Sequence, residues 1–133
     1  MKVCQILLVV LLSSCAYDPG DNRLVIVNRT NHEITLYWNS DTIPEYPSVN
    51  HTEVYLMSYS IKKGLSESQP EDNANWPKFV RNSMNGKLNL FVYDTDSLRS
   101  YNNIDSLNTK KMYKRLEYSL EELDRLNWEI VIK

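Results

Sequence analysis

Alternation between hydrophobic and polar residues recurs along the chain and predicts a series of short β-strands. The predicted strands are residues 24–27, 33–38, 53–61, 88–93 and 128–132. In 33–38, the side chains of Ile34, Leu36 and Trp38 fall on one face, as expected of a strand with one buried side. The run 88–93 is apolar on both faces toward its end, which is typical of a central strand.

Polar segments separate these strands. Residues 28–32 are expected to form a hairpin loop, and the Pro-, Ser- and Asn-rich stretches 39–50 and 64–75 are expected to form longer loops. Several short strands with few helices favour a mainly β fold. The sequence therefore predicts a single immunoglobulin-like β-sandwich over residues 23–133, with one or two short helices near the C-terminus.

One helix has a clear start signal. Ser119 and Glu122 have the spacing of a capping box, in which each side chain bonds the backbone N–H of the other residue. A stripe of three leucines follows, so we expect a helix over 120–126 that packs through Leu123 and its neighbours. A second short helix is expected at about 97–101.

The N-terminus has the pattern of an export signal. Lys2 precedes an apolar run over 3–12, which is too short to span a bilayer of about 30 Å as a helix. The segment then ends in Leu12-Ser13-Ser14-Cys15, which resembles the lipobox of bacterial lipoproteins. The resemblance implies that residues 1–14 are removed, that Cys15 carries acyl chains such as palmitate, and that the membrane is reached through this lipid. Residues 15–22 would form a tether.

A second resemblance covers the last third of the chain. The segments 90–96, 114–123 and 126–128 resemble those of uncharacterised small lipoproteins of Bacteroidetes. The resemblance implies a lipid-anchored protein of the cell envelope and supplies no activity. Because Ala16, not Asp, follows the lipidated cysteine, we expect the outer membrane, on its periplasmic or surface face.

Composition and charge exclude some classes of function for this protein. The 133 residues carry a formal net charge of −2, so the chain lacks the basic footprint of a nucleic-acid-binding protein. Of its two cysteines, Cys4 lies in the signal and Cys15 is the lipidation site. The domain therefore has no thiol left for a disulfide, a metal or a nucleophile.

Catalytic motifs are missing from the sequence, so we do not expect an enzyme, and no cofactor is implied. Three glycines follow the signal, too dispersed for a phosphate-binding loop. The only histidines, His32 and His51, lie in polar loop sequence and are expected to be solvated. A small hydrolase could draw carboxylates from Glu121, Glu122 and Glu129, but the first two fit the exposed face of a helix.

An acidic cluster offers the one metal-site hypothesis. Asp94 and Asp96 follow an apolar strand, with Asp105 nearby, and their oxygens could bind calcium. The spacing lacks the glycine and terminal Glu of an EF-hand loop. We therefore expect no metal site but a turn and a helix cap, supplied by Thr95 or Asp96.

Nine tyrosines and three tryptophans are the remaining signal for function. Exposed rings stack on sugars and anchor protein interfaces, whereas buried rings fill a small core. Five tyrosines lie in or near the predicted strands and loops. Packing in the core or at its edge is the favoured role for these five, which are Tyr37, Tyr46, Tyr55, Tyr59 and Tyr101. We predict a non-catalytic module that binds a glycan or an envelope protein. The alternative is an immunity or inhibitor lipoprotein that neutralises a toxin.

A short motif occurs three times. Asp41-Thr42-Ile43, Asp96-Ser97-Leu98 and Asp105-Ser106-Leu107 each match Asp-Ser/Thr-apolar, which resembles the O-glycosylation motif of exported Bacteroidetes proteins. The resemblance makes Thr42, Ser97 and Ser106 candidate glycan acceptors. The competing interpretation is that these dipeptides serve turns and caps.

Overall fold

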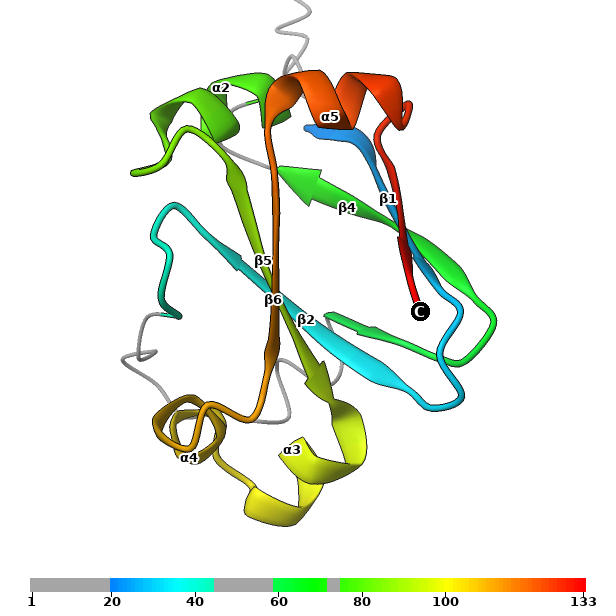
Figure 1. Cartoon of the computed structure of the whole chain (residues 1–133). Helices are drawn as coiled ribbons and strands as arrows, with labels where there is room; N and C mark the ends of the chain where they lie inside the picture. Colours follow the sequence, from blue (N-terminus) through cyan, green and yellow to red (C-terminus); the bar gives the residue numbers. More distant parts are fainter. Residues whose placement is uncertain (1–19, 45–58, 72–74) are drawn as a thin grey trace, which may run out of the picture.

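The computed structural model describes residues 20–44, 59–71 and 75–133, and the fold is mainly β with short helices. Two sheets are formed, with strand orders β4-β1-β7 and β3-β2-β5-β6 (Figure 1). In chain order the elements are β1 (Asp21–Asn28), β2 (Ile34–Asn39), β3 (Ser60–Ile61), β4 (Ser66–Glu71), α2 (Trp76–Asn82), β5 (Leu88–Asp94), α3 (Thr95–Tyr101), α4 (Ile104–Thr109), β6 (Lys114–Tyr118), α5 (Leu120–Arg125) and β7 (Glu129–Ile132).

The two sheets are joined by connections that cross between them. β1 pairs with β4 antiparallel and with β7 parallel, whereas β2 pairs with β3 and β5, and β5 with β6, all antiparallel. The polar segment after Asn28 therefore connects strands of different sheets, and the predicted hairpin there is wrong. Turn-forming residues mark where a chain reverses, but they do not specify which strand its neighbour pairs with.

The main core contains side chains of both sheets. Leu24 and Ile26 from β1 cluster with Leu36 from β2 and with Leu88 and Leu90 from β5, all of them fully buried. The predicted inward faces of β2 and β7 are confirmed: Trp38 packs against this core from β2, and Ile130 and Ile132 are buried in it from β7.

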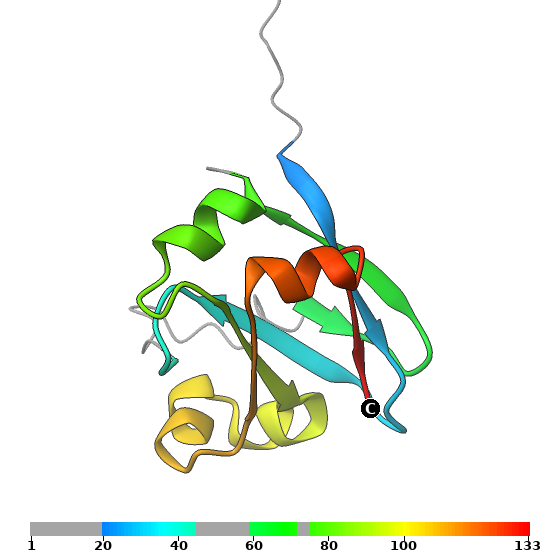
Figure 2. The same cartoon turned by 45° about the horizontal axis from the view of Figure 1, so that its top comes forward.

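β5 is buried on both faces, as predicted. Its Phe91 and Tyr93 point away from the main core and form a second cluster with Leu98 of α3 and with Ile104 and Leu107 of α4. α2 and α5 lie at one end of the molecule, whereas α3 and α4 lie at the other (Figures 1 and 2).

The predicted α5 and its capping box are confirmed. The Ser119 hydroxyl accepts a bond from the Glu122 N–H, and Glu122 Oε2 accepts one from the Ser119 N–H at 2.7 Å. The helix ends when Asn127, at φ 50°, turns the chain so that the Trp128 N–H donates to the Leu123 carbonyl. Leu123 is fully buried, but Leu126, expected in the same stripe, is 43% exposed.

Several elements differ from those expected from the sequence. β4 lies within a predicted loop: its sequence is SESQPE, and Gln69 is its one buried residue among residues 66–70. The sequence-based prediction also did not include β6, α2 and α4. β1 begins at Asp21, within the segment predicted as a tether. Of the predicted strand 53–61, residues 53–58 lie outside the described residues.

Candidate functional site: the groove between β6 and β7

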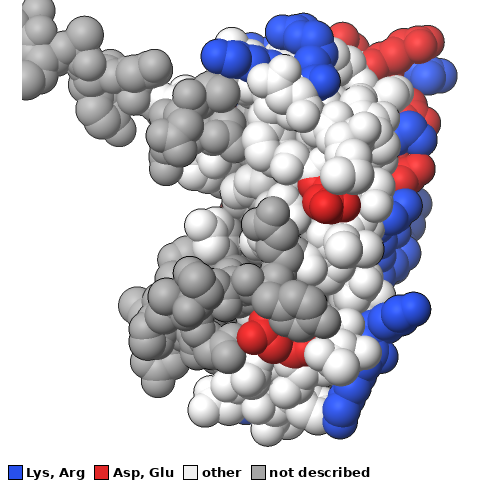
Figure 3. Space-filling model, turned by 90° about the vertical axis from the view of Figure 1, so that its left-hand side faces the viewer, with Lys and Arg blue, Asp and Glu red and all other residues white. Residues whose placement is uncertain are grey.

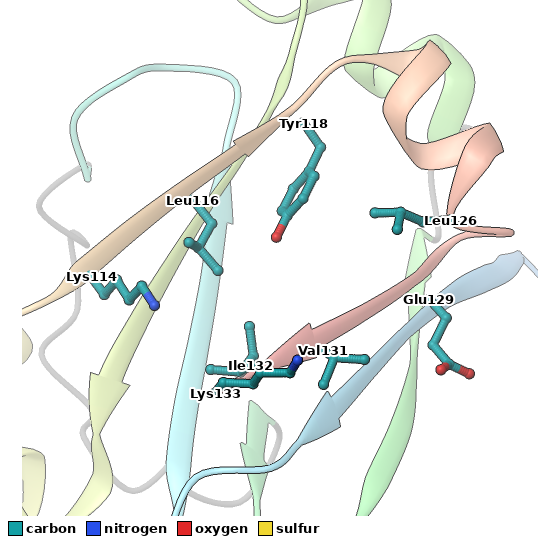
Figure 4. A pocket seen from close by; sticks show the side chains of 8 residues that line it. All are labelled: Lys114, Leu116, Tyr118, Leu126, Glu129, Val131, Ile132 and Lys133. Carbon is teal, nitrogen blue, oxygen red and sulfur yellow. The ribbon is translucent and has the colours of Figure 1, made fainter.

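An open groove lies between the outermost strands of the two sheets. It has a volume of about 390 Å³, within the range of ligand sites. Its lining comes from β6, from β7 with the last residue of the chain, and from the turn after α5: Lys114, Leu116, Tyr118, Leu126, Glu129, Val131, Ile132 and Lys133. The Leu116 and Tyr118 side chains point from β6 toward β7 (Figure 4).

The groove exists because the sheets differ in size. β6 is the fourth strand of its sheet, whereas the facing sheet ends at its third strand, β7. Leu88 and Leu90 on β5 are fully buried, but Leu116 and Tyr118, their register partners on β6, are only half-buried. The inner face of β6 is thus incompletely covered, and an apolar strip is left accessible.

Tyr118 gives the groove a polar group. Partial burial, and then the negative charge of Glu122, raise the pKa of the Tyr118 hydroxyl above its ordinary value. The hydroxyl therefore stays protonated at neutral pH and can donate a hydrogen bond. It points into the groove, where a ligand could accept that bond (Figure 4).

Charge is distributed unevenly along the groove. Lys114 begins β6 and Lys133 follows β7, so both lie at one end, whereas Glu129 lies toward the other (Figure 4). None of these three side chains forms an ion pair with another residue in the described part of the chain. By contrast, Arg115 and Glu117, the residues that alternate with the groove lining on β6, pair with each other at 2.7 Å.

No face dominated by one sign of charge is seen on the side of the molecule shown in Figure 3. There, basic and acidic side chains alternate along one edge, a basic group lies at the top, and separate acidic groups lie among uncharged residues. Opposite charges also pair on β6, where Glu117 lies 2.9 Å from Lys87. A single-sign surface is the feature that would steer a highly charged partner.

The acidic residues predicted as a cap or calcium site have separate local roles. Asp94 is the N-cap of α3, and its Oδ1 accepts a 2.7 Å bond from the Ser97 N–H. The expectation that Thr95 or Asp96 caps the helix is wrong. Thr95 is buried, with its hydroxyl 2.9 Å from that of Thr35, and Asp96 is exposed and pairs with Arg99.

Asp105 lies in the first turn of α4, which is capped by Asn103. Within residues 20–44, 59–71 and 75–133, no group of three or more His, Cys, Asp and Glu residues is placed to hold a metal ion. Asp94 is instead 3.5 Å from His32, measured from Oδ2 to Nε2. His32 is partly exposed, as expected of a loop histidine, and His51 lies outside the described residues.

Asp94 makes the stability of the fold depend on pH. Burial acts to raise the pKa of its carboxyl group, but the hydrogen bonds from Ser97 and the charge of His32 outweigh burial and lower the pKa. A lowered pKa in the folded state means that the ionised carboxylate stabilises the fold. This contribution is complete above the ordinary Asp pKa and is lost as the pH falls through the lower folded-state value.

We expect Asp94→Ala to lower the free energy of unfolding by about 1 kcal/mol, as for a lost N-cap. Asp96→Ala should change it by less than about 0.5 kcal/mol, because the Asp96–Arg99 pair is exposed. Asp94→Asn keeps a good cap and should flatten the loss of stability in acid. Urea denaturation between pH 3 and 7, with and without calcium, measures these effects; a calcium-dependent gain that Asp96→Ala abolishes would contradict this assignment.

The candidate modification sites lie in different parts of the protein. Thr42 is in the segment after β2, Ser97 in α3 and Ser106 in α4, and all three residues are half-buried. Ser97 and Ser106 each donate a backbone N–H to a capping side chain, which is the competing role expected for such motifs. O-glycosylation stays a prediction. The predicted lipidation site, Cys15, lies outside the described residues.

The tyrosines singled out from the sequence are divided between packing and exposure. Tyr37 packs against the second cluster, near Phe91, and Tyr59 contacts Trp38 edge to face at 5.3 Å. Tyr101 is 40% exposed, with the Lys110 ammonium 4.4 Å from its ring centre. Tyr46 and Tyr55 lie outside the described residues.

The carboxylates considered for hydrolysis are spread over two elements. Glu121 and Glu122 are exposed on α5, where Glu122 completes the capping box, and Glu129 is exposed on β7. Glu129 is the only one of the three that lines the groove.

Sequence reasoning missed the groove because it missed β6. The run Lys114-Arg115-Leu116-Glu117-Tyr118 does alternate, with Leu116 and Tyr118 on one face and Arg115 and Glu117 on the other. This alternation could have identified the strand. The partial exposure of the inner face of β6 could not have been predicted, because this exposure depends on how many strands the other sheet contains.

Comparisons with protein-family models, curated proteins and solved structures found no match to this chain. In the described part of the structure, the helices are too short or too polar to cross a bilayer.

Proposed function

We propose that this protein is a lipid-anchored, non-catalytic binding module of the cell envelope, which contacts its ligand through the groove between β6 and β7. The observation that carries the proposal is the accessible apolar strip formed by Leu116 and Tyr118. Half-buried aromatic and aliphatic side chains in a concave surface are characteristic of binding sites. The lining holds one carboxylate, Glu129, and no histidine or cysteine to assist acid–base or nucleophilic chemistry.

The anchor part of the proposal rests on the sequence. The apolar run before Leu12-Ser13-Ser14-Cys15 supports cleavage before Cys15 and its lipidation, as in the Bacteroidetes lipoproteins that the chain resembles. We place the mature protein at the outer membrane. For its architecture we propose an immunoglobulin-like sandwich, because the main core draws on both sheets and the first and last described strands pair in parallel.

The immunity or inhibitor function is kept as the alternative, since it needs the same anchor. It would be favoured by an acidic stripe that fits a basic toxin. Arg115 and Glu117 on the outward face of β6 instead have opposite charges and pair with each other.

Replacing Cys15 with Ala tests the anchor. We expect the variant to stay as an uncleaved precursor or to be released from the outer-membrane fraction, because acylation and cleavage both require the thiol. Cell fractionation and mass spectrometry of the N-terminal peptide measure this. A wild-type mature chain without acyl groups, recovered away from membranes, would contradict the proposal.

Binding is tested on the full-length protein in detergent, with a glycan array and with pull-down from envelope extracts. Tyr118→Ala should reduce ligand retention at least about tenfold if the ring lies at the centre of the contact. Tyr101→Ala is the matched control, because Tyr101 is exposed on α3 and does not line the groove. Equal retention by the two variants would show that the groove is not the binding site.

A further inference from the structure

We propose that the groove binds an extended segment of a partner protein, which adds to β7 as the fourth strand of the three-stranded sheet. The segment carries apolar side chains at alternate positions and an acidic residue at one end. This inference rests on the binding function proposed above and names the class of its ligand.

Among the strands that the structure describes, none pairs with the second edge of β7, and this edge provides the backbone groups for such pairing. The Val25 N–H donates to the Trp128 carbonyl, and the Arg29 N–H to the Ile132 carbonyl. Because backbone groups of successive residues in a strand point to opposite sides, those of Val131 point away from β1. β7 is the outer strand of its sheet, and an outer strand with outward-pointing N–H and C=O groups is a template for another strand.

The added strand would also cover the accessible part of β6. Next to β7, it would lie opposite β6, the strand for which the smaller sheet has no counterpart. Its inward side chains would then pack on Leu116, Tyr118 and Leu126. β6 is five residues long, or about 17 Å at 3.3 Å per residue, so a segment of five or six residues matches the groove.

Charge sets the direction of the segment. Lys114 and Lys133 lie together at one end of the groove, and Glu129 lies toward the other (Figure 4). An acidic residue of the ligand would meet the two lysines, and the reverse orientation would bring it toward Glu129. Such partly exposed charges contribute more to orientation and selectivity than to affinity.

The groove chemistry favours a protein strand over a glycan. A sugar presents many hydroxyl groups and needs several neutral hydrogen-bonding side chains around it. Among the lining side chains, the Tyr118 hydroxyl is the one neutral polar group, and the others are aliphatic or charged. A β-strand satisfies its own polar groups through the backbone, so it suits an apolar groove beside a free edge.

The same geometry disfavours a second copy of the chain. If β7 paired antiparallel with β7 of another molecule, a two-fold axis perpendicular to the sheet would relate the copies. Both four-stranded sheets would then lie on the same side of the joined sheet. Each β6 would be directed into the space of the other copy, whereas a single added strand avoids this conflict.

The test uses the full-length protein in detergent and a displayed library of random decapeptides. The tightest peptide is synthesised, and its Kd is measured by fluorescence anisotropy. We expect alternating apolar residues and an acidic residue at one end in the selected peptides. Val131→Pro should weaken binding at least about tenfold, because it removes an outward N–H that β1 does not use. Val131→Thr is the matched control, which keeps the N–H and the β-branched shape and should bind within about threefold.

A charge exchange gives an independent readout, in case the proline variant is poorly folded. Lys114→Glu should weaken binding of the acidic peptide. Replacing the acidic residue of the peptide with Lys should restore its binding to this variant. Equal binding by folded Val131→Pro and wild type, or no recovery in the exchange, would overturn the proposal.

Three further outcomes distinguish the strand ligand from the binding function on which it rests. A glycan-array signal that Tyr118→Ala abolishes, with no selected peptide, would overturn the strand ligand and keep the binding module. Absence of binding to peptides, glycans and envelope extracts would overturn both. A dimer in sedimentation experiments that Val131→Pro dissociates would identify a second copy as the occupant and overturn the strand ligand.

Discussion

Asn28→Asp is expected to lower the free energy of unfolding by about 4 kcal/mol. Asn28 is fully buried at the end of β1. Its Nδ2 donates to the His32 carbonyl at 2.8 Å and to the Ile61 carbonyl at 2.9 Å. Its Oδ1 accepts from the N–H and the hydroxyl of Thr30. The side chain therefore ties the crossing between the sheets to β3.

The substitution keeps the size of the side chain and removes its donor. The aspartate would bring a carboxylate oxygen against the two carbonyl groups, in a place where water cannot solvate it. Chemical denaturation at pH 7 measures the loss, and acid should recover part of it as the new carboxyl gains a proton and can donate again. Asn31→Asp, at an exposed position in the same loop, should cost less than about 0.5 kcal/mol. Similar effects at the two positions would contradict this account.

Trp76→Ala is expected to cost about 4 kcal/mol, because it empties the end of the main core. Trp76 is fully buried, and its rings contact those of Trp38 and Phe79 edge to face at 5.5 and 5.6 Å. Its Nε1–H donates to the Gln69 carbonyl at 2.9 Å, which ties α2 to β4. Loss of the side chain removes this bond and leaves a large cavity.

Graded variants separate the two parts of this effect. Trp76→Phe keeps a ring but loses the donor, so it should cost about half as much as Trp76→Ala. Met84→Ala is the control, since Met84 is 75% exposed, and it should lie within about 0.5 kcal/mol of wild type. Circular dichroism at 222 nm follows unfolding in all three. A cost below about 1 kcal/mol for Trp76→Ala would show that this end of the core is not well packed.

Features that depend on neighbouring residues could be predicted from the sequence alone. The alternation in β2 and β7 assigned their inward faces, because side chains of a strand point alternately to its two sides. The apolar β5 was predicted as a central strand and is buried on both faces. Ser119 and Glu122 fixed the start of α5 because a capping box closes over four consecutive residues.

The choice of the N-cap residue of α3 depends on both the local sequence and a tertiary contact. Asp94, Thr95 and Asp96 are all short polar side chains near the end of a strand, and the sequence favoured Thr95 or Asp96 as the cap. The structure assigns the cap to Asp94 because the Thr95 hydroxyl is buried against Thr35 of the neighbouring β2. A contact between the start of α3 and the distant strand β2 thus excludes Thr95 as the cap, and Asp96 instead pairs with Arg99.

The distribution of strands between the sheets and the position of the groove depend instead on contacts between distant parts of the chain. β4 has almost no hydrophobic pattern and is held by pairing with β1 and by the Trp76 bond to Gln69. Leu116 and Tyr118 alternate like buried residues but are half-covered, because the facing sheet ends one strand short. Local sequence sets which side chains share a face of a strand, whereas the burial of that face depends on strands that pair far along the chain.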